Sequence, residues 1–210
     1  MNSLAHAEAF INNKRSRREA ALMFGAYQKK LTDVLEHFDW TPVVELGEWL
    51  WDCWCEKLRV FICGNGGSAA NACHLANDFI YGIDIPNGYG LMVEALPANT
   101  AVMSCLANDT GYDNVFAQQI KVKANRGDVL IVLSGSGNSA NVVNAIDVAN
   151  AMGLQTAAIL GFEGGQCKEK AHLPIHFEID DMQISEDTQV MVGHMLMQWL
   201  AKRKQCYQCV

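Results

Sequence analysis

The sequence predicts an α/β fold, a doubly wound parallel sheet with helices on both faces, preceded by a helical N-terminal arm. From residue 59 onward, short apolar runs of strand length alternate with helical stretches, which is the pattern of a parallel sheet. Residues 129–133 are continuously apolar, as expected of a strand covered on both faces. Two strands end in turns rich in glycine and serine that lead directly into a helix. Since ligands bind at the carboxyl ends of strands in such sheets, these turns mark the expected ligand site.

The N-terminal arm is expected to be helical throughout. Apolar residues recur at helical spacing in residues 20–38. Pro42 marks the start of another helix, because proline fits the first helical turn, and residues 43–55 continue it. We expect the arm to cover residues 1–57 and a single domain to cover residues 58–205.

The elements of the domain follow from its apolar runs and from the residues that begin or end helices. Ser68 is placed to cap the first helix of the domain, and Gly153 to end a later one in the C′ position. We expect strands at residues 59–63, 91–95, 129–133, 156–160 and 175–179. We expect helices at residues 68–81, 99–107, 113–124, 140–151 and 185–202, and a short one that begins at Gly164 and Gly165.

Composition excludes several classes of function. The 210 residues carry a net charge of −7, which argues against an electrostatic binder of nucleic acid or membranes. No apolar run is long enough to span a bilayer, and the N-terminus lacks the apolar segment of a signal peptide. We therefore expect a cytoplasmic protein whose eight cysteines are reduced. A zinc or redox role for the CxxC of Cys206 and Cys209 stays open, although no second pair has matching spacing.

The segment from Ser134 to Ser139, with the sequence SGSGNS, predicts a phosphate site. Its hydroxyl groups alternate with glycine just before a helix, so that side-chain O–H groups, backbone N–H groups and the helix N-terminus can surround an anion. The loop lacks the lysine of a P-loop, so no nucleotide cofactor is expected. The simpler alternative is a serine-rich turn without a ligand. The candidate binding residues are Ser134, Gly135, Ser136 and Ser139.

A second glycine-rich turn follows the first strand of the domain. It places Asn65, Gly66, Gly67 and Ser68 before a helix, and it also suits an anion. It lacks the third glycine of a dinucleotide fingerprint, so a nicotinamide enzyme fits poorly.

Four side chains near these turns are competent for metal binding or proton transfer. His74 and Asp78 are four residues apart and share one helix face. Glu186 and His194 are eight residues apart, which also gives one face but a separation of about 12 Å along a straight helix. Together they could hold zinc or another divalent metal, or they could perform general acid–base chemistry without a metal.

These motifs together resemble the sugar isomerase (SIS) domain family, and most closely its phosphoheptose isomerase branch. The similarity runs from about residue 20 to residue 203. It implies a flavodoxin-like three-layer sandwich and an aldose–ketose isomerase. The implied reaction converts sedoheptulose 7-phosphate to D-glycero-D-manno-heptose 7-phosphate through an enediol, for heptose biosynthesis. The family's site residues correspond here to Asn65, Gly66, Gly67, Ser68, Asn99, Ser134, Ser136 and Ser139 for substrate, and to His74 and His194 for zinc, with His194 also transferring a proton.

The chain departs from the family pattern at three positions. Asp78 stands where the family has a catalytic glutamate, Glu186 where it has glutamine, and Asn99 where it has aspartate. A base that is one methylene shorter can misplace the proton by about 1 Å, which can cost around a hundredfold in rate. We hypothesise that Glu186 compensates by acting as the base, while both carboxylates remain candidate metal ligands.

Two functions of another class stay open. One SIS relative is a non-catalytic assembly factor that binds the bacterial replication initiator, and a phosphosugar-sensing module would need only the serine loop. The family further implies a homotetramer with sites between subunits, built by the N-terminal helices. The alternative is that the apolar stripe of these helices packs only within its own chain.

Overall fold

The computed structural model describes the backbone of residues 2–206 and the side chains of residues 16–206. The chain divides into two units, Met1–Phe38 and Asp39–Val210. The first unit consists of α1 (Asn2–Glu36), one continuous helix. Helix α2 (Thr41–Glu56) belongs to the second unit and packs against α8 and β5, whereas we expected it to belong to the arm. The division between the units therefore precedes α2 instead of following residue 57.

The second unit contains one five-stranded parallel sheet, as predicted. Its strand order is β2-β1-β3-β4-β5, and every neighbouring pair is parallel. The chain leaves β1 toward β2 on one side, and continues from β3 toward β4 and β5 on the other. The adjacent ends of β1 and β3 therefore form the topological switch point, where such sheets bind ligands. The strands are β1 (Arg59–Gly64), β2 (Met92–Ala95), β3 (Val129–Ser134), β4 (Gln155–Leu160) and β5 (Leu173–His176).

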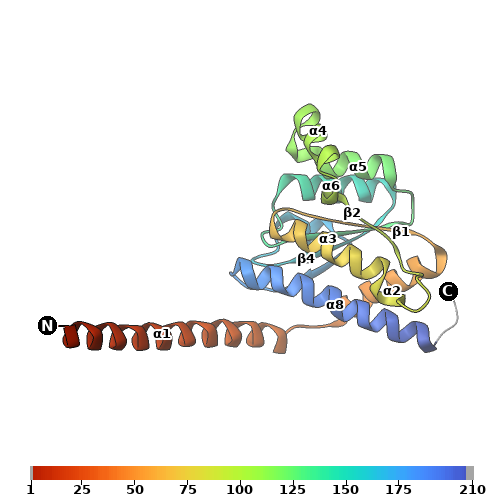
Figure 1. Ribbon diagram of the computed structural model, residues 1–210. Helices are drawn as coiled ribbons and strands as arrows, with labels where there is room; N and C mark the ends of the chain where they lie inside the picture. The colour runs from red at the N-terminus through yellow and green to blue at the C-terminus, as the bar shows by residue number, and fades with distance from the viewer. Residues whose placement is uncertain (1, 207–210) are drawn as a thin grey trace. The chain divides into compact units, whose positions relative to one another are not determined.

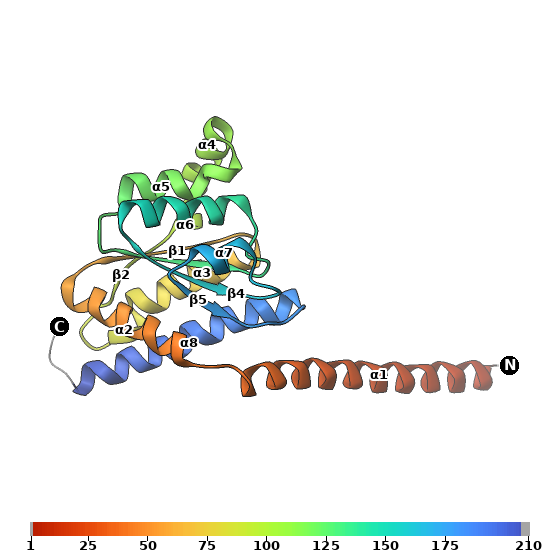
Figure 2. The same cartoon turned by 180° about the vertical axis from the view of Figure 1, so that it is seen from behind.

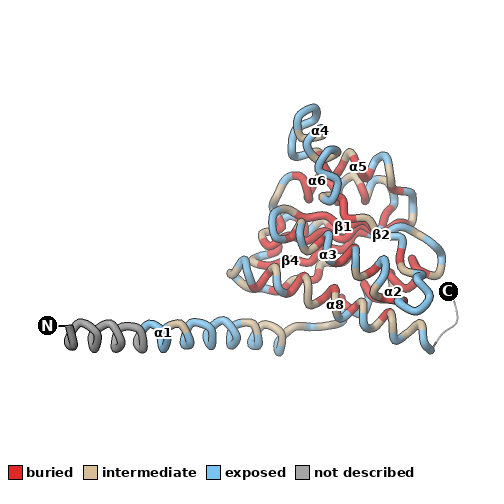
Figure 3. Tube along the Cα trace, viewed as in Figure 1, coloured by how far each residue is buried: buried red, intermediate tan, exposed pale blue. Residues whose placement is uncertain are grey.

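Helices cover both faces of the sheet and make three layers (Figures 1 and 2). Helices α5, α6 and α7 lie on one face, and α2, α3 and α8 lie on the other. The central strands are buried, as the red tube in Figure 3 shows. Side chains on both faces of the sheet point into an apolar layer beneath the helices. These helices are α3 (Gly67–Ile80), α5 (Val115–Lys123), α6 (Ala140–Met152), α7 (Gly165–Lys170) and α8 (Met182–Cys206), and α4 (Thr100–Thr110) precedes α5.

Helix ends test two of the expectations from sequence. Gly153 ends α6 with φ 79°, and its N–H donates to the carbonyl groups of Ala149 and Asn150, which confirms the predicted C-terminal glycine. The prediction that Ser68 caps α3 is wrong. The helix begins earlier, because Gly66 adopts φ 55° as the N-cap, and Ser68 is buried inside the first turn.

Helices α3 and α8 pack in close contact, and three features align them. Near the start of both helices, Asn71 Nδ2 donates to the Glu186 carbonyl and to Gln189 Oε1, each at 3.0 Å. In the middle, Gly193 lies so close to α3 that an added Cβ would be 2.1 Å from Leu75 Cδ2. The third feature lies at the far end of α8.

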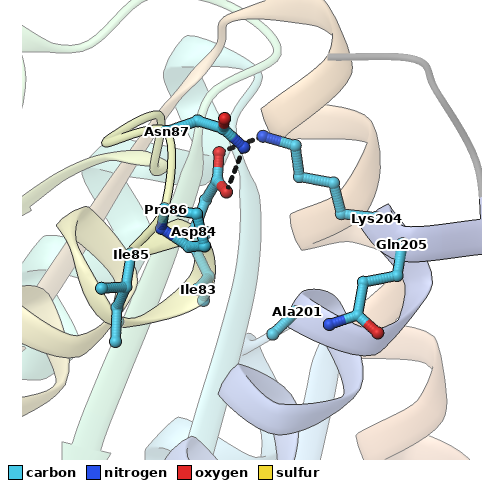
Figure 4. A pocket seen from close by; sticks show the side chains of 9 residues that line it. Ile83, Asp84, Ile85, Pro86, Asn87, Ala201, Lys204 and Gln205 are labelled. Carbon is cyan, nitrogen blue, oxygen red and sulfur yellow. Dashed lines mark hydrogen bonds and ion pairs between the residues drawn. The ribbon is translucent and has the colours of Figure 1, made fainter.

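At that far end, Lys204 forms a hydrogen-bonded ion pair with Asp84, in the turn that follows α3. Figure 4 shows this pair in a pocket, with the Asn87 amide donating to the same carboxylate at 2.9 Å. The Asp84 side chain is only 6% exposed, and the Lys204 side chain only 15%. The ion pair therefore ties the end of α8 to the end of α3.

We predict that Gly193→Ala destabilises the protein. The new methyl group would overlap the buried Leu75 side chain, and overpacking of this kind costs about 1–3 kcal/mol. The free energy of unfolding in urea measures the effect. Gly47→Ala is the control, because Gly47 also lies in a helix that packs against α8. Its new methyl group would be 3.2 Å from Trp199, and a small shift of the side chain relieves that contact. Equal destabilisation by the two substitutions would contradict the prediction.

A second prediction concerns acid stability. Burial raises the pKa of Asp84, but hydrogen bonds from Lys204 and Asn87 outweigh it, so the pKa lies below its ordinary value of 3.8. The ionised carboxylate therefore stabilises the fold above about pH 3.8, and this contribution is lost as the pH falls further, through the lowered value. We expect Asp84→Asn to lower the melting temperature at pH 7, and the difference from wild type to shrink only as the pH falls below about 3.8. A difference that stays constant with pH would exclude this account.

Candidate active site

The two predicted ligand turns lie next to each other at the switch point. One follows β1 and the other follows β3, and the register pairs Gly64 with Leu133 at their ends. A Cβ at Gly64 would be 2.7 Å from the Leu133 carbonyl oxygen and 2.8 Å from Ser68 Cβ, so only glycine permits this approach. The close packing brings both turns to one edge of the sheet.

The serine loop after β3 is held in a defined shape by its own hydroxyl groups. Ser134 Oγ accepts from the Gly137 N–H at 3.0 Å, and Ser136 Oγ accepts from the Asn138 N–H at 3.3 Å. Ser139 is the N-cap of α6, yet its hydroxyl makes no capping hydrogen bond. The first N–H groups of α6 lack partners within the helix, as at every helix N-terminus. The loop therefore presents hydroxyl and amide donors to an anion without a basic side chain of its own.

A neighbouring loop, which the sequence did not assign to the site, supports the serine loop. Gly137 has φ 65°, and a Cβ there would be 1.9 Å from the Gly164 carbonyl oxygen. The Cys167 N–H donates to the Gly137 carbonyl at 2.9 Å, and the Gln166 N–H donates to Asn138 Oδ1 at 3.0 Å. These interlocking contacts mean that the serine loop is formed before any ligand binds.

Glu186 covers the glycine turn at the start of α3. A Cβ at Gly67 would be 2.3 Å from Glu186 Oε1 and 2.4 Å from Oε2, so the carboxylate lies directly against the backbone of the turn. An anionic side chain is favourable at a helix N-terminus. The turn therefore already holds one of the protein's own carboxylates, which leaves the serine loop as the position for a phosphate.

Three of the four predicted metal or proton-transfer residues converge. The Nε2 atoms of His74 and His194 are 2.8 Å apart, although the residues are 120 positions apart in sequence. Asp78 Oδ2 lies 3.5 Å from His74 Nε2 and 3.3 Å from His194 Nε2. The imidazole side chains are 49% and 42% exposed and the carboxylate 16%, so the cluster is open to ligands on one side.

This donor set fits a catalytic zinc ion. Two imidazoles and one carboxylate are common zinc ligands, and three protein ligands leave one coordination position for substrate. Without a cation, two imidazole nitrogens this close can share only one proton, and a metal ion satisfies both lone pairs. Among the described residues, Glu186 does not belong to this cluster, because it lies about two helical turns from His194 on α8.

The remaining predicted residue, Asn99, caps the start of α4. Its Oδ1 accepts from the Val102 N–H at 3.2 Å, and its side chain is exposed. Its amide nitrogen and the second lone pair of its oxygen stay available to a ligand. Of the tail cysteines, Cys206 is exposed at the end of α8, and Cys209 lies outside the described residues.

Sequence reasoning missed several polar residues that support the site. Asn71 and Gln189 join α3 to α8, and Gln189 Nε2 is a buried donor that has no partner among residues 16–206. Asn141 and Tyr112 both hydrogen-bond to Asn65. For Asn141 on α6 and Gln189 on α8, the available signal was a polar residue among the buried positions of a helix, since buried amides require partners.

None of the described helices combines the length and apolar character that crossing a membrane requires.

Comparison with protein families gives one clear match. The model of the SIS domain matches residues 26–161, which is more than half of the chain. The matched region includes both ligand turns, His74 and Asp78, and it ends before α8.

Curated relatives extend the similarity over nearly the whole chain. The phosphoheptose isomerase of Clostridium acetobutylicum is 31% identical over 189 residues, which cover 90% of this chain and 90% of that protein. The phosphoheptose isomerase of Chlorobaculum tepidum is 35% identical over 181 residues, which cover 84% of this chain and 85% of that protein.

Solved structures share the fold. A phosphoheptose isomerase from Neisseria gonorrhoeae has a TM-score of 0.80 at 25% identity, over 89% of this chain and 98% of that chain. A phosphoheptose isomerase from Francisella tularensis has a TM-score of 0.82 at 19% identity, over the same shares of the two chains, which supports the fold alone. The predicted fold class and family resemblance are both confirmed: the chain belongs to the SIS-domain family and, within it, to the phosphoheptose isomerases.

Proposed function

We propose that this chain is an aldose–ketose isomerase that converts sedoheptulose 7-phosphate to D-glycero-D-manno-heptose 7-phosphate through an enediol, for heptose biosynthesis. The observation that carries the proposal is the convergence of His74, Asp78 and His194 on the same two helices that border the ligand turns. The names of the relatives agree with this reaction.

The serine loop is the proposed phosphate site. Ser134, Gly135, Ser136 and Ser139 would surround the phosphate with hydroxyl groups, backbone N–H groups and the N-terminus of α6. Asn65, Gly66, Gly67 and Ser68 would contact the sugar from the opposite turn, and Asn99 would approach from α4. The serine loop lacks the lysine of a P-loop, and the Asn65–Ser68 turn lacks the third glycine of a dinucleotide fingerprint, so we expect no nucleotide cofactor.

His74, Asp78 and His194 would hold a zinc ion. When bound, zinc supplies a Lewis acid that polarises the substrate carbonyl and stabilises the oxyanion that forms. Asp78 Oδ2 lies near the Nε2 atoms of both histidines, so the short Asp78 side chain is suited to act as a ligand of the same ion. His194 would also serve as the second proton-transfer group when it is not held by the metal.

Glu186 would then move the proton between C1 and C2. Its carboxylate is half-buried beside the Asn65–Ser68 turn and is separate from the metal cluster. A general base placed there can reach a sugar bound across the two turns without competing for the cation. Glu186 would thus act as the base in place of the catalytic glutamate for which this chain has Asp78.

We predict that two variants differ in zinc content. Glu186→Gln should keep zinc at the wild-type level but lower kcat by about 10²- to 10⁴-fold, the usual contribution of a general base. Asp78→Asn should lose both zinc and activity, because one of three ligands is weakened. The assay is formation of the aldose product from sedoheptulose 7-phosphate, with metal analysis of each purified variant.

The assay also separates the alternatives. Full activity in Glu186→Gln would refute its role as base. Turnover by metal-free wild type would favour acid–base chemistry by the imidazole and carboxylate groups alone. Sedoheptulose 7-phosphate that binds without turnover, with or without added zinc, would favour a phosphosugar-sensing protein.

We also infer that the protein forms a homotetramer through α1. Apolar residues alternate at spacings of four and three along this helix, which is the seam of a coiled coil. Phe24 on this helix is 73% exposed. The seam residues are Ala20, Phe24, Tyr27, Leu31 and Val34.

Cytoplasmic localisation stays a prediction.

Phe24→Glu should reduce the oligomer to smaller species in light scattering coupled to size-exclusion chromatography, because it puts a charge in the seam. Leu22→Glu is the matched control, since Leu22 is 66% exposed but lies on the opposite side of the heptad. If Phe24→Glu assembles like wild type, the apolar stripe is covered in another way.

A further inference from the structure

A network of two amides and one phenol crosses the switch point between the two ligand turns. Asn65 Nδ2 donates to Asn141 Oδ1 at 2.8 Å, and Asn141 Nδ2 donates back to Asn65 Oδ1 at 2.8 Å. Tyr112 Oη donates to the same Asn65 Oδ1 at 2.9 Å. The network joins the turn after β1 to the first turn of α6, which starts at the end of the serine loop.

The hydrogen bonds determine what Asn65 can still offer to a ligand. An amide oxygen has two lone pairs, and both of those on Asn65 Oδ1 already accept a hydrogen bond. The amide nitrogen carries two hydrogens, of which the paired amide of Asn141 takes one. The side chain is therefore left with one free N–H and no free acceptor.

The partners of Asn65 are themselves held in place by α6. Asn141 is only 2% exposed, and its amide cannot turn without leaving buried polar atoms unpaired. Tyr112 begins a short 3₁₀ turn, Tyr112–Asn114, whose Asp113 carbonyl accepts from Asn144 Nδ2 at 2.9 Å. Asn141 and Asn144 are three residues apart and share a helix face. One helix therefore orients both groups that orient Asn65.

We propose that Tyr112 and Asn141 are positioning residues that hold Asn65 as a single hydrogen-bond donor toward an oxygen of the sugar phosphate. This inference rests on the proposed function, because it takes Asn65 as a substrate contact. The ligand atom must be an acceptor, such as a carbonyl, hydroxyl or phosphate oxygen. Preorganised in this way, the donor loses little freedom when the substrate binds.

Tyr112→Phe tests the proposal, because it removes the hydroxyl and keeps the ring. We expect KM for sedoheptulose 7-phosphate to rise about three- to tenfold, the effect of one misoriented neutral hydrogen bond, with kcat within about twofold of wild type. Tyr112 is 54% exposed, so the melting temperature should not change. Tyr81→Phe is the matched control, since Tyr81 is 56% exposed at the end of α3 and makes no hydrogen bond to Asn65.

A double-mutant cycle distinguishes positioning from an independent effect. If Tyr112 acts through Asn65, Tyr112→Phe should have no further effect on KM in an Asn65→Ala background. The same KM for Tyr112→Phe and wild type, or an equal effect in both backgrounds, would overturn the inference.

A readout without substrate separates this inference from the proposed function. The side-chain amide of Asn65 gives two proton signals by NMR, and their shifts and exchange rates depend on its partners. We expect Tyr112→Phe to move these signals, whereas Tyr81→Phe should leave them in place. Unchanged signals would overturn the positioning role even in an active enzyme. If wild type shows no turnover, the isomerase proposal fails, and the NMR result decides the positioning role by itself.

Discussion

The close packing of α3 on α8 is the constraint on which the site depends. Gly193 allows the helices to approach until Leu75 fills the space where a side chain would be. His194 follows Gly193 directly, so the same contact brings its imidazole to the imidazole of His74. Without this approach, the partners that the structure describes for Asp78 would all lie on α3. The Asn71 amide near one end of the helix pair and the Asp84–Lys204 ion pair at the other prevent the helices from sliding.

The second constraint is the pairing of β1 with β3, which divides the chemistry between two turns. The β3 turn presents hydroxyl and amide donors, and it is braced by a neighbouring glycine loop. The β1 turn instead holds the Glu186 carboxylate against Gly67. A phosphate and a carboxylate repel each other, so this arrangement favours the phosphate at one turn and proton transfer at the other. The Asn65–Asn141 amide pair joins the two turns and sets the orientation between them.

Much of the fold could be predicted because it depends on local patterns. The apolar run of residues 129–133 became the central strand β3, and Gly153 ended α6 as expected. The cap at Ser68 was predicted wrongly, because a glycine turn can start a helix without a capping side chain. Helix α2 was expected in the arm, since its own sequence does not reveal that its Trp- and Leu-rich face packs on α8 and β5.

The sequence by itself determined the residue types, the two ligand turns, and the pairing of His74 with Asp78, because spacing along one helix fixes which side chains are neighbours. Only the tertiary structure decided that His194 completes this group while Glu186 does not, since both lie on one face of α8 and only packing on α3 distinguishes them. The same holds for Asn141 and Tyr112. Their contacts with Asn65 span 76 and 47 residues, and hydrogen bonds over such separations arise from the packing of the whole domain rather than from any local pattern.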